Sequence, residues 1–354
     1  MRERARKVLA PEVWDFVEGG SGTEFTIAAN RAAFDEIALI PRVLTGVIAA
    51  DTSARLVGTE AALPVAIAPT AYQRLVHHDG ELAAARAARA AGIPYVVSTL
   101  SSCRLEDISA SGADIWFQLY CLRDQAKNHE LIDKAEKTGC RALMVTVDVP
   151  LMARRLRDIR NGFALRPEVW AANIDSGPGS EAHRKADWAS AVAVHTSAAF
   201  APGLSWRDLA DLRRRTSLPL VVKGVLDPRD ARAAVDIGAD AVVVSNHGGR
   251  QLDGCQPSMR ALPSVVVAVN GECEVLLDSG VRSGVDVLKA LALGARGVLL
   301  GRPVLWGLAA GGEDGTGEVL SLLGTELREA MTLTGCGDVA SASALRTERL
   351  KTHG

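Results

Sequence analysis

Residues 218–248 read LPLVVKGVLDPRDARAAVDIGADAVVVSNHG, and this stretch decides the fold class. Two valine-rich apolar runs, 218–225 and 241–248, flank a segment with helical spacing, DPRDARAAVDIG (227–238). Apolar runs without polar alternation are typical of parallel strands that helices cover on both faces of a sheet. The stretch therefore predicts a strand, a covering helix and a second, parallel strand.

The same unit recurs on both sides of this stretch, with glycine or proline at the joints. The candidate strands are LPVAIAPT (63–70), IPYVVST (93–99), ADIWFQLY (113–120), ALMVTVDV (142–149), LPLVVKGV (218–225), AVVVSNHG (241–248), CEVLLDSG (273–280) and GVLLGRP (297–303). Eight such units in one chain favour a closed (β/α)8 TIM barrel. An open Rossmann-type sheet is the alternative, but no GxGxxG turn follows the first strand.

Two segments fall outside the repeat, although we expect one domain over residues 1–354. Residues 1–62 precede the barrel, which is expected over 63–336, and they contain a predicted helix near 11–18. Residues 151–204 form a long excursion after the fourth strand. A loop of this length within a barrel is usually functional, so we interpret it as a lid.

Composition excludes several classes of function. The formal net charge is −2, so no basic excess indicates nucleic-acid binding. The six cysteines form no CxxC pair, which argues against a zinc site or a disulfide framework. No apolar run reaches the roughly 20 residues that span a bilayer, and no leader pattern opens the chain. We expect a cytoplasmic protein whose partners are small molecules or copies of itself.

Barrel enzymes carry their catalytic groups at the carboxyl ends of the strands. Here every candidate strand ends on hydrogen-bonding side chains, which a purely structural barrel would not require. In chain order they are Thr70, Ser98, Gln118, Tyr120, Thr146, Asp148, Lys223, His247, Asp278 and Arg302.

The most specific local motif is SNHGGRQLD (245–253). His247 can take up a proton near neutral pH, and Arg250 can hold a carboxylate with two parallel hydrogen bonds. The glycine pair between them lets the backbone approach a ligand closely. The other histidines lack such neighbours and are expected on the surface.

A second cluster is TVDVPLMARRLRDIRN (146–161). Asp148 ends the fourth strand, where a buried carboxylate could orient an imidazole. Arg154 or Arg155 could supply another carboxylate clamp. We expect Arg157 and Arg160 to lie in solvent and to pair with Asp158.

A third cluster follows the last two strands, in LLDSGVRSG (276–284) and LLGRP (299–303). Glycines with Arg282 and Arg302 at this place are typical of a phosphate site in a barrel. Lys223 could lie beside an electron-rich ring, or it could form a Schiff base. The second interpretation predicts a sugar-phosphate lyase instead.

Together these segments resemble the FMN-dependent family that oxidises 2-hydroxy acids, such as glycolate, lactate and mandelate. The resemblance runs from WDFVEGGSGTEFTIAANRAAF (14–34) to MTLTGC (331–336). It includes, in order, PVAIAPTA, WFQLY, VTVDVP, RDIRNGF, LPLVVKGV, SNHGGRQLD, DVLKALALGA and GRP. Within the family, GGSGTE, APTAYQRL and RRLRDIRNGFAL are most similar to the 4-hydroxymandelate oxidases.

The resemblance implies roles for the residues that contact substrate. His247 matches the family's catalytic base, and Asp148 matches the carboxylate behind it. Arg155 and Arg250 match the guanidinium groups that bind the substrate carboxylate, and Tyr120 matches the tyrosine at the substrate hydroxyl.

The resemblance also implies an FMN site. Lys223 matches the lysine near N1 and O2 of the flavin, where positive charge stabilises the reduced ring. The residues that match flavin-ring and ribityl contacts are Thr70, Ala71, Ser98, Gln118, Thr146 and Ser245. Those that match the ribityl and phosphate end are Asp278, Gly280, Arg282, Gly301 and Arg302.

Four positions depart from the family pattern. Phe16 stands where many members have a second carboxylate-binding tyrosine, and Leu100 stands where glycolate oxidase has a tryptophan. Both are expected in the substrate site, and Leu100 leaves space for an aromatic ring. Ser279 replaces the middle glycine of Asp-Gly-Gly, where a Cβ atom is expected to strain the turn. Ala153 replaces a glycine before the arginine pair.

The expected reaction is oxidation of an (S)-2-hydroxy acid, with mandelate or 4-hydroxymandelate favoured, to the 2-keto acid. FMN would take two electrons, and O2 would be reduced to H2O2. A dehydrogenase with another acceptor, the Lys223 lyase and a non-catalytic flavin-binding protein are the alternatives. Whether the α-hydrogen leaves as a proton or as a hydride stays open. The resemblance also implies a tetramer.

Overall fold

The computed structural model describes residues 1–174, 181–184 and 190–350. Its centre is a closed parallel barrel with the strand order β10-β11-β4-β5-β6-β7-β8-β9. The strands are β4 (Val65–Ile67), β5 (Tyr95–Ser98), β6 (Ile115–Leu119), β7 (Ala142–Thr146), β8 (Leu220–Val225), β9 (Ala241–Val244), β10 (Glu274–Leu277) and β11 (Gly297–Leu300). The predicted (β/α)8 fold is confirmed, and each candidate strand contains one barrel strand.

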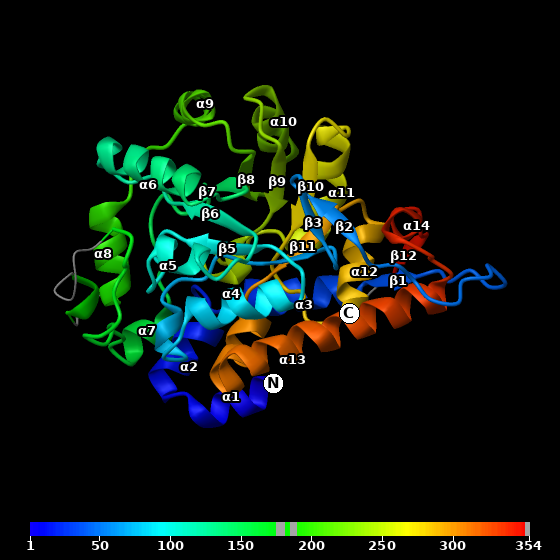
Figure 1. Ribbon diagram of the computed structural model, residues 1–354, viewed down its shortest axis with the longest axis horizontal. Helices are drawn as coiled ribbons and strands as arrows, with labels where there is room; N and C mark the ends of the chain where they lie inside the picture. Colours follow the sequence, from blue (N-terminus) through cyan, green and yellow to red (C-terminus); the bar gives the residue numbers. More distant parts are fainter. Residues whose placement is uncertain (175–180, 185–189, 351–354) are drawn as a thin grey trace.

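Helices cover the outside of the barrel (Figure 1). Alternate side chains of the strands point outward to these helices and inward to a separate apolar cluster, so both faces are buried. This double burial explains why the strands read as continuous apolar runs. The covering helices are α4 (Glu81–Ala90), α5 (Leu105–Ser109), α6 (Gln125–Lys137), α9 (Trp206–Arg215), α10 (Pro228–Asp236), α11 (Ser258–Val269), α12 (Gly284–Ala292) and α13 (Arg302–Thr334).

The segment before the barrel has more structure than the one predicted helix. That helix is α2 (Pro11–Glu18), which begins with proline at its first position and buries an apolar face that includes Trp14. It lies between α1 (Arg2–Val8) and α3 (Phe25–Asp35). Both α1 and α2 contact α13 (Figure 1).

Two short strand pairs and one helical turn complete the fold outside the barrel strands. Strand β1 (Ile37–Leu39) pairs antiparallel with β12 (Thr347–Arg349), next to α14 (Val339–Ser343). Strands β2 (Ala54–Leu56) and β3 (Thr59–Ala61) form a hairpin that packs into the amino-terminal end of the barrel. A short helical turn, η1 (Gln73–Leu75), follows β4.

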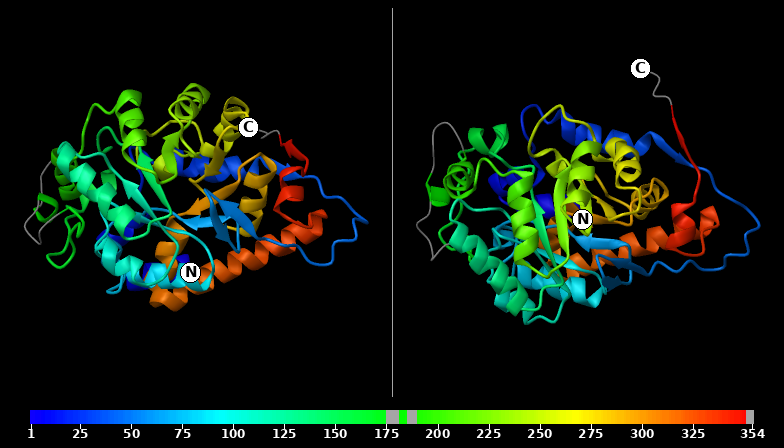
Figure 2. Two further views of the ribbon diagram at one scale, coloured as in Figure 1. Left: turned by 45° about the horizontal axis from the view of Figure 1, so that its top comes forward. Right: turned by 90° about the horizontal axis from the view of Figure 1, so that it is seen from above.

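The excursion after β7 is partly helical. Its described residues include α7 (Leu156–Arg160), η2 (Glu181–His183) and α8 (Ala191–Ala199). Figures 1 and 2 place α7 and α8 at one end of the molecule, opposite the β1–β12 pair. Whether this segment acts as a lid stays a prediction. Among the described residues, no helix combines the length and apolar character needed to cross a bilayer.

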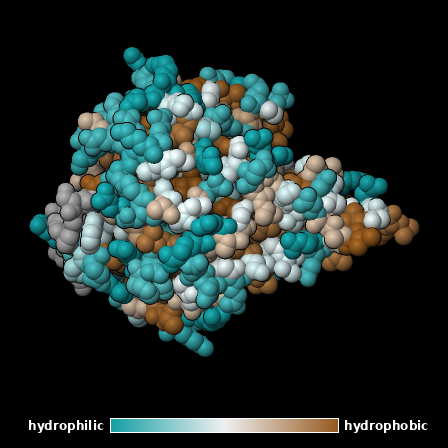
Figure 3. Space-filling view, viewed as in Figure 1, coloured by the Kyte–Doolittle hydropathy of each residue, from teal (hydrophilic) through white to brown (hydrophobic). Residues whose placement is uncertain are grey.

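The connection between β1 and β2 projects from the far end of the molecule. Val43, Leu44 and Ile48 on this connection are 80%, 101% and 94% exposed. Figure 3 shows apolar side chains gathered at this tip. Such a patch on a projecting loop is typical of a surface that another protein chain covers.

Candidate active site

One pocket opens at the carboxyl end of the barrel, with about 1120 Å³ of empty space that includes part of the open solvent at its mouth. Every barrel strand contributes lining residues, because parallel strands bring all their carboxyl ends to the same side. Helix α2 and helix α8 add Phe16, Val17 and Val192. Residues far apart in the sequence therefore meet in one site.

The structure brings the predicted site residues together. Those that line the pocket are Phe16, Thr70, Ala71, Ser98, Leu100, Tyr120, Thr146, Arg155, Lys223, His247, Arg250, Asp278, Gly280, Arg282, Gly301 and Arg302. The other three lie directly behind it. Asp148 bonds to His247, Gln118 bonds to Ser98, and Ser245 bonds to Lys223.

His247 and Asp148 form a hydrogen-bonded pair. The Nδ1 atom of His247 lies 2.9 Å from Oδ1 of Asp148. A carboxylate only accepts hydrogen bonds, so Nδ1 carries the hydrogen and Nε2 keeps a free lone pair. Burial lowers the pKa of His247 below its ordinary value, although Asp148 acts in the opposite direction. The imidazole is thus a neutral base at physiological pH.

Tyr120 lies beside this base. Its hydroxyl is 3.5 Å from Nε2 of His247, and its ring stacks on Phe200. Burial, together with the negative charge of Asp148, raises the pKa of Tyr120 to about 12. The hydroxyl therefore stays protonated and can donate a hydrogen bond to a substrate oxygen.

Two buried guanidinium groups face the same space. Arg250 donates from Nη1 to the carbonyl oxygens of Phe16 and Gly19, at 2.7 and 2.8 Å, and lies over the Phe16 ring. Arg155 contacts Met152 Sδ, and its Nε atom has no hydrogen-bond partner among the described residues. Burial lowers the pKa of both arginines, and their mutual repulsion adds to this effect at Arg250. An anionic ligand would relieve this buried positive charge.

The expected pairing of Asp158 is wrong. Arg157 instead binds Asp15 and Glu24, which fixes α7 to the N-terminal segment. Asp158 is only 1% exposed, and burial raises its pKa while Arg155 and Arg250 lower it. A five-residue helix, α7, turns Asp158 inward and Arg157 outward, and spacing alone did not reveal this orientation.

Lys223 is held as a cation. Its Nζ atom lies 2.9 Å from Oδ2 of Asp278 and 3.0 Å from Oγ of Ser245. Burial alone would lower the pKa of Lys223, but the Asp278 and Asp148 carboxylates raise it above its ordinary value. A permanently charged amine suits an anionic ring and is a poor nucleophile for a Schiff base.

A second group of arginines and glycines lines the pocket, and Arg302 shares the Gly19 carbonyl oxygen with Arg250. Arg282 lies over the Trp306 ring, and its pKa falls to about 9 because of burial and the nearby Arg302 and Arg31. Arg302 donates to the carbonyl oxygens of Val17, Gly19 and Gly248. Like charges buried together are costly unless an anion lies between them. A phosphate group meets this requirement.

The lining also fits the rest of FMN. Among the described residues, the buried Nε2 of Gln118 and Oγ1 of Thr146 have no hydrogen-bond partner. Buried polar groups are nearly always bonded, so these atoms indicate a polar ligand edge. At Gly301, a Cβ atom would meet nothing closer than Thr70 at 4.0 Å and would project into the pocket. One pocket thus offers unpaired polar groups, open glycine backbone and clustered arginines, which suit the ring, the ribityl chain and the phosphate of FMN.

The four departures from the family pattern occupy different places. Phe16 stacks on Phe163 at 4.5 Å between ring centroids, and Leu100 is buried in the pocket wall. Ser279 has φ +73°, so the expected backbone strain is present. The backbone N–H of Ala153 donates to Gln251, which ties the loop after β7 to the loop after β9.

The remaining histidines lie outside this site. His78 and His129 are exposed, as expected, whereas His195 is buried at 7% exposure, so its expected surface position is wrong. Helix α8 turns His195 inward. His77 and His183 are partly buried, and His353 lies outside the described residues.

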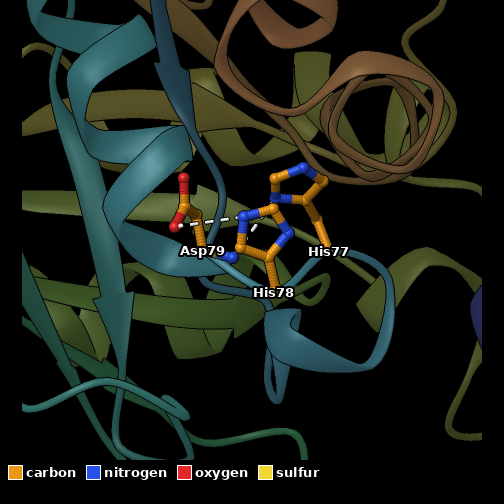
Figure 4. A group of neighbouring side chains, drawn as sticks. All are labelled: His77, His78 and Asp79. Carbon is orange, nitrogen blue, oxygen red and sulfur yellow. Dashed lines mark hydrogen bonds and ion pairs between the residues drawn. The ribbon is translucent and has the colours of Figure 1, made fainter.

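Within the described part of the chain, one cluster could offer metal-ligand atoms: His77, His78 and Asp79 (Figure 4). The two imidazole rings have centroids 4.2 Å apart, and their planes are tilted by 32°. Asp79 also binds Arg86, whose positive charge opposes a second cation at this place. The cluster lies outside the pocket and takes no part in the site.

Sequence reasoning missed several residues of the pocket. Met152 and Val192 come from the excursion after β7, and Val281 and Leu305 flank the arginine cluster. Apolar residues in irregular segments carry no periodic signal, so only the three-dimensional path of the chain could have revealed them.

Comparisons with known proteins agree with this geometry. The model of the FMN-dependent dehydrogenase family matches residues 5–349. The 4-hydroxymandelate oxidase of Amycolatopsis orientalis is 54% identical, over 98% of this chain and 97% of the relative. The L-lactate oxidase of Nostoc sp. is 45% identical over 95% and 93%, and 2-hydroxyacid oxidase 1 of Homo sapiens is 42% identical over 95% and 92%.

A solved structure is similar over almost its full length. The crystal structure of mandelate oxidase with (S)-4-hydroxymandelic acid superposes with a TM-score of 0.96, at 54% identity, over 99% of this chain and 98% of that chain. Family match, identity and fold all cover nearly every residue that builds the pocket. The chain belongs to the FMN-dependent dehydrogenase family.

Proposed function

We propose that this protein is an FMN-dependent oxidase that converts an (S)-2-hydroxy acid, R–CH(OH)–COO⁻, to the 2-keto acid. The observation that carries this proposal is that three groups meet at one pocket. They are the neutral imidazole of His247, bonded to the Asp148 carboxylate, and two buried arginines. A base and a carboxylate clamp are what a 2-hydroxy acid needs for removal of hydrogen at its α-carbon.

Arg155 and Arg250 bind the substrate carboxylate. Both line the pocket, and both carry buried positive charge that the Asp158 carboxylate offsets only in part. Two guanidinium groups on one carboxylate fix its plane as well as its position. Tyr120 donates its hydroxyl hydrogen to the substrate oxygen at the α-carbon, next to Nε2 of His247.

His247 takes up one proton at Nε2 during the oxidation. Because Nδ1 already donates to Asp148, the resulting imidazolium is held beside a carboxylate that stabilises its charge. This role is the same whether the proton comes from the α-carbon or from the hydroxyl. Lys223, paired with Asp278, places a fixed positive charge at the electron-accepting side.

The residues that would hold FMN all lie in or directly behind the lining of this pocket. Gln118, Thr146 and Ser98 supply polar groups to the ring, and Gly301, Gly280, Arg282 and Arg302 surround the phosphate. When bound, FMN supplies the two-electron acceptor, and O2 then reoxidises it to give H2O2.

We further propose that R is an aryl group, as in mandelate or 4-hydroxymandelate. The pocket wall near Tyr120 is apolar, with Phe16, Leu100, Met152 and Val192. The relative from Amycolatopsis orientalis is named for 4-hydroxymandelate, and the mandelate oxidase structure contains that acid. A lactate-sized substrate would leave most of this apolar wall without contact.

Two further predictions concern the whole molecule. The exposed Val43, Leu44 and Ile48 support association of copies of this chain, and the family resemblance predicts a tetramer. The cytoplasmic location rests on the sequence alone.

The test begins with the visible spectrum of the purified protein. We expect a yellow protein that bleaches anaerobically with (S)-mandelate and (S)-4-hydroxymandelate, at least about tenfold faster than with L-lactate or glycolate. Admission of O2 should restore the colour and release one H2O2 per keto acid. Bleaching by lactate or glycolate alone would remove the aryl assignment, and return of colour only with another acceptor would indicate a dehydrogenase. A colourless protein trapped on its substrate by borohydride would favour the Lys223 lyase.

A further inference from the structure

The turn after β10 holds a serine in a backbone conformation that favours glycine. Ser279 has φ +73°, between Asp278 and Gly280, and its side chain is buried at 7% exposure. A side chain in the left-handed region is strained, and glycine would adopt it without strain. A strained serine in the wall of a reactive pocket indicates that its hydroxyl has a use.

The hydroxyl of Ser279 makes three hydrogen bonds. It accepts from the backbone N–H of Asn246 at 3.2 Å and from that of Gly248 at 3.0 Å. It donates to Oδ1 of Asp278 at 2.7 Å. One donor and two lone pairs are all that a hydroxyl has, so this group is fully used.

The two amides that Ser279 accepts flank His247. The amide between them, the N–H of His247 itself, donates to the Ser245 hydroxyl at 3.0 Å. Two serine hydroxyls therefore hold three successive amides, and His247 itself has φ +58°. Both hydroxyls connect to Lys223, Ser245 directly and Ser279 through the Asp278 carboxylate.

From this arrangement we propose that Ser279 is a positioning residue for the catalytic base. Its hydroxyl fastens the turn at Asn246–Gly248 to the loop after β10, so that His247 keeps its left-handed backbone and its orientation toward Asp148. The same bonds fix the position of His247 relative to the Asp278–Lys223 ion pair. This inference rests on the proposed function of His247.

Substitutions of Ser279 distinguish a hydroxyl that positions the turn from a hydroxyl without a role. If only strain matters, Ser279→Gly relieves it and should leave the enzyme unchanged or improved, and Ser279→Ala should resemble the natural protein. If the hydroxyl positions the turn, both substitutions leave two amides without their acceptor. The two variants should then show the same loss of function, although the glycine variant is free of backbone strain and the alanine variant is not.

The experiment measures hydrogen–deuterium exchange in the FMN-loaded protein, in peptides that cover residues 244–251 and exclude residue 279. We expect exchange about tenfold faster in Ser279→Gly and in Ser279→Ala, with an unchanged melting temperature or a higher one for the glycine variant. The matched control is Ser258→Ala, because the buried Ser258 hydroxyl donates to the carbonyl oxygens of Asp278 and Ser279 and does not reach the His247 turn. Unchanged exchange in both Ser279 variants, or equal acceleration in the control, would overturn the proposal.

A second readout links the turn to chemistry. Anaerobic flavin reduction by (S)-mandelate should slow by at least about tenfold in both Ser279 variants, while their FMN content stays that of the natural protein. If the natural protein itself is not reduced by any hydroxy acid, the proposed function fails, and the exchange experiment still decides the role of Ser279. Loosened exchange with an unchanged reduction rate would overturn the positioning role.

Discussion

The two ends of the barrel differ in whether their buried polar groups find hydrogen-bond partners within the protein. At the amino-terminal end, the β2–β3 hairpin fills the opening with Leu56 and Val57, and its polar neighbours are satisfied. The indole N–H of Trp116 donates to Thr59 at 3.1 Å, and the N–H of Val57 donates to Glu274 at 2.9 Å. At the carboxyl end, buried atoms of Gln118 and Thr146 have no partner among the described residues.

The difference separates stability from function. The closed end has no need of a ligand, so its contacts contribute to the folded state at all times. The open end buries polar groups without partners and arginines that repel one another. Their burial costs free energy until ligands bind and pair with them. Substitutions at the closed end should therefore change stability, and substitutions at the open end should change activity.

The largest effect is expected at the base. His247→Asn should reduce anaerobic flavin reduction by roughly a thousandfold or more, because the described residues that line the pocket include no second histidine. Asparagine tolerates the left-handed backbone of His247, so FMN content and melting temperature should stay unchanged. Stopped-flow absorbance measures the reduction. A variant reduced at nearly the natural rate would refute the assignment of the base.

The next effect compares neighbouring arginines. Arg155→Met should lower kcat/KM by about a hundredfold, because a buried charge-assisted bond to the substrate carboxylate is lost. Arg157→Met is the matched control, since Arg157 binds Asp15 and Glu24 and does not line the pocket. Steady-state kinetics with (S)-mandelate measure both. Equal losses in the two variants would contradict a specific carboxylate clamp at Arg155.

A substitution at the closed end should act on stability. Leu56 is fully buried against the barrel interior, so Leu56→Ala should lower the free energy of unfolding by about 2–5 kcal/mol. Denaturant unfolding measures this change. The variant's kcat/KM, determined below its melting temperature, should stay within about twofold of the natural value. Strong loss of activity in the folded variant would show that the two ends are coupled.

The smallest effect is the pH dependence. Because burial lowers the pKa of His247 below 6.5, the neutral base should predominate above that pH and kcat/KM should be flat there. At lower pH, protonation of His247 should reduce kcat/KM by about tenfold per pH unit. In Asp148→Asn the carboxylate that raises this pKa is gone, so the acid limb should move to lower pH. An acid limb above pH 7, or one shifted upward in Asp148→Asn, would contradict the assigned pair.

The barrel could be predicted because its signal is local. Each buried strand is a short apolar run, and each joint carries glycine or proline, so eight units can be counted along the chain. The ring of polar groups could be predicted for the same reason, since Lys223 lies near the end of β8, Asp278 directly follows β10 and His247 comes three residues after β9. The β2–β3 hairpin escaped prediction because valine occupies the first turn position at φ +47°, where asparagine or aspartate is the usual signal.

Orientation on short or irregular segments could not be predicted. Spacing alone made Asp158 the partner of Arg157, but α7 buries the aspartate and turns the arginine toward α2 and α3. His195 was expected on the surface because it lacks the neighbours of a catalytic histidine, but it lies in the alanine- and valine-rich α8, whose packing buries it. One turn of helix moves a side chain from solvent to core, and no periodic pattern of this length records the difference.

The fold class, the family and the candidate site residues could be predicted from the sequence alone, because all three depend on which residues follow which strand. Only the tertiary structure decided how those groups act on one another. The charge of Lys223 depends on Asp278, the free Nε2 of His247 depends on Asp148, and the held turn depends on Ser279. Each of these pairs joins different strands, and only closure of the barrel brings such strands to one mouth.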